Sequence, residues 1–341
     1  MPGQDTRDDV YLPHEMTTPK IQHYVPQFLL RNFGRGKKDQ VWVFDKLTGR
    51  VFPSNARNVA SENRFYDFEH SGDTLSMEPM LSRLESATKP ILAEVLRRDS
   101  LAVLTEETAA TLAMFFAVQM VRGRTFREQW RQLPQLLRDA FRSRRETPAE
   151  DSQADQLTRD LANNQVKAET AQFVMDAAKD FTPHFLAKDW VLAAASAPHG
   201  SFLLGDNPVA LQNSTNPGDG IRGTLGLAVP GIEIYIPLSP ERALAFWCPS
   251  VTGPIHRAVA AQRAFSGVGR TLPEPRLAAI VDAISSGRPL TFEADHITNI
   301  NGLQIARSER YLFSSSNDFA LAIEMLQSHP ELRTGPRTVI L

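Results

Sequence analysis

The segments IEIYIPLS (residues 232–239) and RALAFWCP (242–249) decide the fold class, because they are short, apolar and rich in β-branched and aromatic residues. Residues of this kind favour β-strands. DWVLAAAS (189–196) and SFLLGDNPVAL (201–211), which precede them, have the same character. Nearer the start, VWVFDK and RVFPS alternate apolar and polar residues around Gly49, which predicts a β-hairpin.

A helical pattern separates these two groups of strand-like segments, from about residue 77 to residue 181. Core-facing positions recur there at steps of three and four, and the most apolar helix contains LAMFFAVQMV (112–121). Pro134 is expected to divide that helix from the next one. Residues 297–316 and 318–327 are predicted as two further helices.

We therefore predict an α+β protein in which a helical block packs against a mostly antiparallel sheet. Residues 1–19 are predicted as a disordered leader, residues 20–330 as a single α+β domain with its helical insertion at about 77–181, and residues 331–341 as a C-terminal tail.

The composition is that of an ordinary globular protein, with 42% hydrophobic and 22% charged residues in 341. Cys248 is the single cysteine, so no internal disulfide can form, which fits a reducing compartment. The chain opens without a signal-peptide pattern and contains no run of 18 apolar residues. We expect a cytoplasmic protein with no membrane partner.

The net charge of −2 argues against non-specific coating of nucleic acid, but the charge is unevenly distributed. Residues 122–145 contain eight arginines and two acids, a local balance of +6. Six of these arginines step by 3, 4, 7, 4 and 3, which predicts one helical face. They are Arg124, Arg127, Arg131, Arg138, Arg142 and Arg145. Such a face could contact a nucleotide or nucleic acid, or it could simply be solvated.

Two candidate site residues lie in HYVPQFLLRNFG (23–34), where His23 and Gln27 are four residues apart. His23 could act as a general acid or base, or it could bond a neighbouring strand. Gln119 and Arg122 belong to the most apolar helix. A buried guanidinium needs a partner, so Arg122 points either to a carboxylate such as Glu85 or to an anionic ligand.

Two further candidate motifs come later in the chain. Asp206 and Asn207 lie in Gly-Asp-Asn-Pro, directly after an apolar strand. Asp206 could be a base or hold a metal, or the pair could bond the backbone of its own turn. Asn301 and Gln304 are three residues apart on a predicted helix, where amides could read a ligand or bond a loop. A cofactor therefore stays unassigned, with a divalent metal as one open alternative.

Several familiar catalytic motifs are missing from the sequence. It contains neither a Gly-rich phosphate loop nor His-Glu-x-x-His, and it has no Gly-x-Ser-x-Gly. A single cysteine cannot form a zinc-binding cluster of cysteines.

HYVPQFLLRNF, FFAVQMVRGRTFRE, FLLGDNPV and NGLQIARSERYLFSS, in that order, resemble a widespread bacterial family catalogued as domain of unknown function 4238. The resemblance covers about residues 20–320. It implies that the polar residues singled out above form one recurring set, which raises the expectation that they converge in space. It implies no particular reaction.

If these residues converge, they would combine a histidine, carboxylates, an arginine and several amides. Histidine and carboxylate suit proton transfer, and arginine suits phosphate. The leading hypothesis is a hydrolase acting on a nucleotide or nucleic acid, such as a nuclease of the toxin or defence type. His23, Asp206 and Arg122 would be catalytic, and the remaining residues would bind substrate: Gln27, Gln119, Asn207, Asn301 and Gln304. The alternative is a non-catalytic binding or interaction module, in which the same residues form a structural hydrogen-bond network.

Overall fold

The computed structural model describes residues 19–195, 200–215, 225–265 and 274–336. Its larger sheet has five strands in the order β12-β7-β11-β10-β9. All neighbours in it are antiparallel except β12 and β7. The strands are β7 (Asp189–Ala195), β9 (Ala210–Asn213), β10 (Ile232–Pro237), β11 (Arg242–Trp247) and β12 (Leu290–Phe292).

A second sheet has four strands in the order β3-β2-β13-β8, all antiparallel. They are β2 (Gln40–Asp45), β3 (Arg50–Asn55), β8 (Leu204–Gly205) and β13 (Tyr311–Ser314). The predicted hairpin is confirmed, because β2 pairs with β3 across a turn in which Gly49 has a φ of +71°. Two small pairs complete the strands: β1 (Ile21–His23) with β4 (Ser61–Asn63), and β5 (Asp67–His70) with β6 (Asp73–Ser76).

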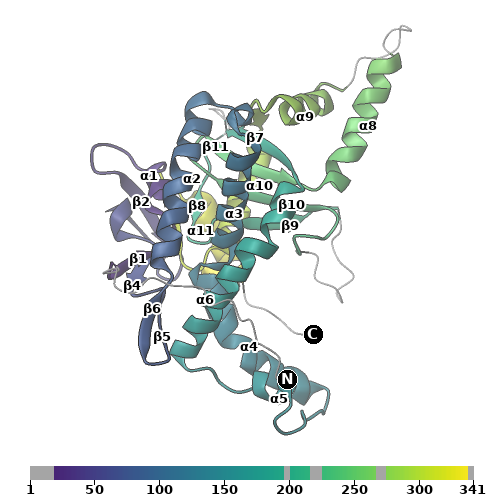
Figure 1. Cartoon of the computed structure of the whole chain (residues 1–341). Helices are drawn as coiled ribbons and strands as arrows, with labels where there is room; N and C mark the ends of the chain where they lie inside the picture. Colours follow the sequence, from purple (N-terminus) through teal and green to yellow (C-terminus); the bar gives the residue numbers. More distant parts are fainter. Residues whose placement is uncertain (1–18, 196–199, 216–224, 266–273, 337–341) are drawn as a thin grey trace, which may run out of the picture.

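The helical block is built around α3, which contacts α2, α6 and α7. Figure 1 shows α2, α3 and α6 side by side on one face of the larger sheet. Phe116 of α3 lies 5.6 Å, centroid to centroid, from Phe246 of β11, so the block and the sheet share one core. The helices of the helical block are α2 (Glu78–Arg98), α3 (Glu106–Val121), α4 (Arg124–Ser143), α5 (Gln153–Leu157), α6 (Asn163–Asp180) and α7 (Thr182–Leu186).

The remaining helices flank the sheets. They are α1 (Gln27–Arg31), α8 (Pro249–Phe265), α9 (Pro275–Ser286), α10 (Ala294–Arg307) and α11 (Ala320–Ser328). Among the described residues, none of the helices is both long and apolar enough to cross a membrane. The α+β class and the mostly antiparallel pairing are confirmed. The strands form two main sheets, however, where the sequence suggested one.

Two helix boundaries differ from the prediction. The helical conformation is interrupted at Gly123, which has an extended ψ of 170° and is the N-cap residue of α4. Helix α4 then continues through Pro134. A proline removes one N–H from the helix ladder and crowds the preceding turn, but Pro134 is buried within α4 and the helix runs through it. Residues 311–314 form strand β13, not the end of a helix, because their apolar side chains enter the core between β2 and β8. The predicted leader and the last five residues of the tail lie outside the described residues.

Candidate functional site

His23 ends strand β1 and precedes the short helix α1, so both its backbone and its ring are held in place. Its Nε2 lies 3.1 Å from the carbonyl oxygen of Arg57, which can only accept a hydrogen bond. Nε2 therefore carries the proton, and Nδ1 faces Gln27 Nε2 at 3.4 Å. Burial lowers the pKa of His23, so the neutral ring is favoured. Its neutral Nδ1 can accept a proton.

Arg122 follows the last residue of α3 and is only 2% exposed. Its Nη2 donates to Glu85 Oε1 at 2.8 Å, which is the partner that the sequence suggested. Among the described residues, its Nε and Nη1 have no hydrogen-bond partner. A buried guanidinium with two unused donors carries a large desolvation cost, so this position favours a second anion.

Tyr66 and Gln119 connect the two motifs that carry His23 and Arg122. The Tyr66 hydroxyl lies within hydrogen-bond distance of the carbonyl oxygens of both His23 and Arg122, at 3.4 and 3.5 Å. Gln119 donates from Nε2 to the carbonyl oxygen of Tyr24 at 2.9 Å. The central helix is thus tied directly to the N-terminal motif, as the hypothesis of convergence requires.

Glu78 joins this group from the first turn of α2. It lies seven residues before Glu85, which puts both carboxylates on one face of that helix. Burial, and then the charge of Glu85, raise the pKa of Glu78 to about 7, while Arg122 acts in the opposite direction. A carboxyl group that is half-protonated near neutral pH, beside a buried cation, is a frequent feature of acid–base sites.

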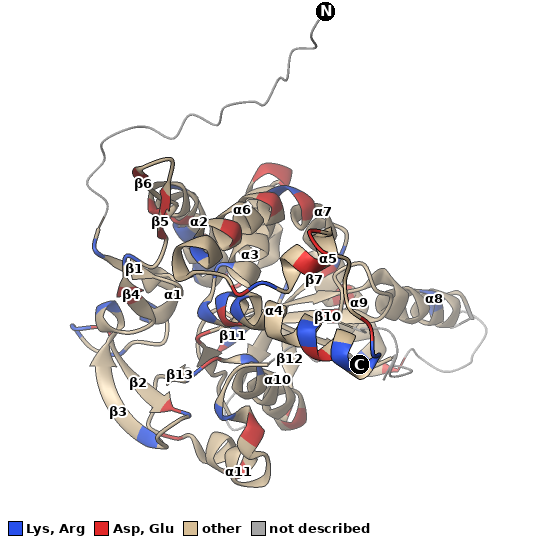
Figure 2. Cartoon of the chain, turned by 90° about the horizontal axis from the view of Figure 1, so that it is seen from below, with Lys and Arg blue, Asp and Glu red and all other residues tan. Residues whose placement is uncertain are grey.

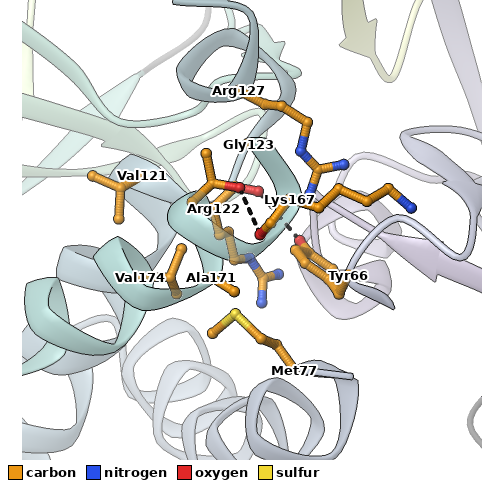
Figure 3. Close-up of a pocket in the computed structure, with 10 residues that line it drawn as sticks. Tyr66, Met77, Val121, Arg122, Gly123, Arg127, Lys167, Ala171 and Val174 are labelled. Carbon is orange, nitrogen blue, oxygen red and sulfur yellow. Dashed lines mark hydrogen bonds between the residues drawn. The ribbon is translucent and has the colours of Figure 1, made fainter. Parts of the chain in front are cut away.

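Arg122 lines a small cavity together with two further cationic residues, Arg127 and Lys167, and several apolar residues (Figure 3). Arg127 is 8% exposed, with its guanidinium carbon 3.5 Å above the centre of the Phe65 ring. Within the described part of the chain, Arg127 forms no ion pair with a carboxylate, and its Nε is unpartnered. Lys167 also lines this cavity, and burial lowers the pKa of both Lys167 and Arg127. We call this cavity the anion pocket.

The start of helix α4 adds to the positive potential of the anion pocket. Gly123, which lines the pocket, is the N-cap residue of α4 and supplies no side-chain cap. The first turn of that helix has no acidic residue. Backbone N–H groups at such an end attract anions. The pocket has a volume of about 10 Å³, room for one water molecule or one oxygen of a larger group.

Asp206, Asn207, Asn301 and Gln304 form a second, separate network. Asn301 and Gln304 of α10 bond the backbone of residues 201–208: Asn301 accepts from Leu203 N and donates to Ser201 O, at 2.8 and 2.9 Å. Gln304 accepts from Gly205 N and donates to Pro208 O, at 2.9 and 3.0 Å. Strand β8 pairs with β13 on one side only, and these amides bond the backbone of the segment that contains this edge strand.

Asp206 is 1% exposed and accepts hydrogen bonds from three consecutive backbone N–H groups, those of Glu309, Arg310 and Tyr311. Burial raises its pKa to about 6 although these three bonds act in the opposite direction. Asn207 donates to the carbonyl oxygen of Arg307 at 3.2 Å. The contacts of this second network are those of a structural element that joins β8, α10 and β13.

The two groups of predicted residues are neighbours but do not form one site. Gly123, which follows Arg122, lies near the second group, because a Cβ atom built there would be 4.0 Å from Asn207 Oδ1. The first group contains His23, Gln27, Gln119 and Arg122. The second group is the network of Asp206, Asn207, Asn301 and Gln304, whose side chains hydrogen-bond to backbone atoms. Among the described residues, no three side chains of the His, Cys, Asp or Glu type cluster as a metal site would require.

The arginine face predicted on one helix is present on α4, but most of its charges are paired. Arg131 and Arg142 bond Glu128 and Asp139 of the same helix. Two others reach acids elsewhere: Arg124 pairs with Glu62 and Arg138 with Asp160. Figure 2 accordingly shows basic and acidic segments next to each other along α4. Arg145 lies beyond the end of that helix. Arg127 turns inward to the anion pocket.

Sequence reasoning missed Glu78, Tyr66 and Lys167, and it assigned Arg127 to the surface. The seven-residue spacing of Glu78 and Glu85 on a predicted helix was the available signal for one of them. Nothing in the local sequence distinguishes Lys167 or Tyr66 from residues of an ordinary helix and turn.

The fold and these contacts define an α+β protein with a buried arginine-centred polar site. Residues 21–318 match the model of the family described as "Protein of unknown function (DUF4238)", so the chain belongs to that family. Comparison with curated proteins gave no match, and neither did comparison with solved structures.

The pKa of Glu78 leads to a prediction about stability. The ordinary pKa of a glutamate in an unfolded chain is about 4.3, whereas in the fold it is about 7. The folded protein therefore holds this proton more tightly, and ionisation of Glu78 costs stability as the pH rises from about 4 to about 7. Glu78→Gln cannot ionise. It is expected to melt a few degrees higher than the native chain at about pH 8 and at the same temperature at about pH 4.

Thermal unfolding of both proteins across this pH range measures the difference. Glu324→Gln, on the exposed face of α11, is the matched control. A Glu78→Gln variant that melts together with the native chain at every pH contradicts a half-buried Glu78 that holds its proton near pH 7.

Proposed function

We propose that this chain is a hydrolytic enzyme that cleaves a phosphate ester of a nucleotide or nucleic acid, with a nuclease of the toxin or defence type as its most specific form. The observation that carries the proposal is the state of Arg122. It is buried, donates from Nη2 to Glu85, and has two further nitrogens, Nε and Nη1, that find no partner in the described part of the chain. A phosphate oxygen would satisfy those donors and the charge together.

The groups around Arg122 have the properties that phosphate-ester hydrolysis needs. Neutral His23 carries no proton on Nδ1, which has only the long contact from Gln27 Nε2 at 3.4 Å. If that contact is displaced, Nδ1 takes a proton from an attacking water molecule, whose oxygen forms the new bond to phosphorus. Glu78, with a pKa of about 7, can give its proton to the oxygen that leaves as the old bond breaks. Both side chains interact electrostatically with Arg122 and Glu85. Glu85 holds the guanidinium in place.

A basic surface next to His23 favours a longer polyanion over a free mononucleotide. A surface cavity of about 410 Å³ is lined by Arg31, Lys37, Lys38 and Arg57, with Asp39 as its one acidic residue. It borders the histidine directly, because Arg57 O accepts from His23 and Arg31 donates to Gln27 at 3.0 Å. Phosphates beyond the cleaved one could bind this surface.

A non-catalytic binding module is the second candidate. It is favoured by the second network, in which Asp206, Asn301 and Gln304 are all bonded to backbone. Under that reading, the basic surface binds nucleic acid and Arg122 is a structural ion pair. The two readings differ in whether bound nucleic acid is cleaved.

His23→Ala is expected to reduce cleavage by a factor of about 10² or more, because the proton acceptor is lost. Its melting temperature should change little, since the half-buried ring makes one hydrogen bond to backbone and one long contact to Gln27. The loss of one such bond costs about 1 kcal/mol. Cleavage of end-labelled single-stranded RNA and DNA measures the first effect and thermal unfolding measures the second.

His329→Ala is the matched control, because His329 is exposed and pairs only with Glu331 in the described structure. Retained cleavage in His23→Ala, or a sharp fall in its melting temperature, assigns His23 a structural role.

A further inference from the structure

A second cavity, separate from the anion pocket, lies between the helical block and strand β9. Its volume is about 250 Å³, the space of about eight water molecules, which approaches the size of ligand pockets in general. Its walls are mainly apolar and include Met120, Phe126, Phe173, Phe181 and Leu211. We call it the apolar pocket.

Aromatic rings form a continuous wall of the apolar pocket. The rings of Phe126 and Phe173 lie 4.8 Å apart, and those of Phe173 and Phe181 lie 6.1 Å apart. Trp130 lies 5.9 Å from both Phe126 and Phe173. A flat, unsaturated ligand can pack against such rings by offset or edge-to-face contacts.

The apolar pocket also contains a small set of polar groups, of which Arg307 is the most informative. Its Nη2 donates to Leu211 O at 3.2 Å. Within the described residues it forms no ion pair with a carboxylate. Burial lowers the pKa of Arg307, because desolvation disfavours the charged guanidinium in this cavity. Arg307 also belongs to the motif NGLQIAR that the sequence singled out.

A second observation concerns polar residues in the wall of the same cavity. Thr125 lines the apolar pocket, and this residue is 3% exposed. Among the described residues, its buried Oγ1 has no hydrogen-bond partner. Asn207 and Gln129 line the pocket as well, and their amide nitrogens donate to the carbonyl oxygens of Arg307 and Pro336. Apolar walls with one described cation and a few polar residues match the usual composition of a small-molecule site.

From this arrangement we propose that the apolar pocket binds a small aromatic acid, with the ring system among Phe126, Phe173 and Phe181 and the carboxylate on Arg307. Charge complementarity selects an anion, because Arg307 is the one cationic side chain among the described residues that line the pocket. The size selects a ligand of one or two rings. Except for Val121, its wall is distinct from that of the anion pocket, so this site does not depend on the proposed hydrolysis.

Calorimetric titration with 2-naphthoate tests the proposal, and 2-naphthamide serves as the neutral analogue of the same shape. The native chain should bind naphthoate at one saturable site at least about tenfold more tightly than naphthamide, because a charge-assisted pair forms only with the carboxylate. Arg307→Met should remove that preference. Arg276→Met, at an exposed arginine paired with Glu293, should keep it.

The comparison of the two ligands on the native chain decides the question even if Arg307→Met does not fold. Equal affinity for naphthoate and naphthamide, or no saturable binding of either, overturns the proposal. Because the readout is binding, a chain that binds naphthoate without cleaving nucleic acid would support this site and refute only the hydrolase.

Discussion

Asp206→Ala is expected to destabilise the fold by about 3–5 kcal/mol and to lower the melting temperature by about 6 °C or more. Asp206 accepts from the N–H groups of Glu309, Arg310 and Tyr311, at 2.6, 2.9 and 2.9 Å. An alanine would leave these donors unpaired at a position that is 1% exposed. Each buried orphan donor costs about 1–3 kcal/mol.

Asp206→Asn separates this structural role from a catalytic one. The amide keeps one acceptor oxygen but turns an NH₂ group toward backbone donors, so it should also destabilise the chain. Asp180→Ala, at an exposed position, is the control and should change stability by less than about 0.5 kcal/mol. Thermal and denaturant unfolding measure all three. If Asp206→Asn melts with the native chain but cleaves nothing, the catalytic role that the sequence suggested is restored.

Arg122→Lys is expected to reduce nucleic-acid cleavage by a factor of about 10² to 10³, the usual effect of losing one preorganised donor to a developing charge. Lysine keeps the positive charge opposite Glu85, so the ion pair can survive. Lysine lacks the planar guanidinium with its set of donors. In the native chain two of those donors, Nε and Nη1 of Arg122, have no partner among the described residues. Cleavage rates at saturating substrate, with melting temperatures beside them, measure the effect.

Arg138→Lys is the matched control, because that arginine is paired with Asp160 at the surface of α4. It should keep the native rate. An Arg122→Lys variant that cleaves at the native rate would show that the unpaired donors do not bind the reacting phosphate.

Some of this architecture could be predicted because local physics dictates it. The β2–β3 hairpin follows from alternating residues around Gly49, and the ion pair follows from an arginine in an apolar helix, which needs a carboxylate such as Glu85. The break at Gly123 was not predicted, since glycine is tolerated within helices and Pro134 is the stronger breaker. In the fold, tertiary packing makes Gly123 the point of interruption and leaves the helix continuous at Pro134.

The composition of the site could be predicted only in part. Amides such as Asn301 and Gln304 look the same in sequence whether they bond a ligand or a backbone. Their role became visible once β8 and the following turn proved to lack a strand neighbour on that side. Glu78 was missed because an acid in the first turn of a helix has an ordinary explanation in the helix dipole. Its raised pKa depends on burial and on Glu85, which are properties of the fold.

The most direct test asks whether His23, Glu78 and Arg122 form an acid–base site. It measures the cleavage of end-labelled single-stranded RNA and DNA by the native chain and by Glu78→Gln, from about pH 5 to about pH 9. The predicted result is cleavage by the native chain that falls as the pH rises through about 7, where Glu78 loses its proton. In Glu78→Gln, cleavage should be slower by a factor of about 10² or more, without that limb of the profile. Binding without cleavage in the native chain, or an unchanged profile in Glu78→Gln, would contradict it.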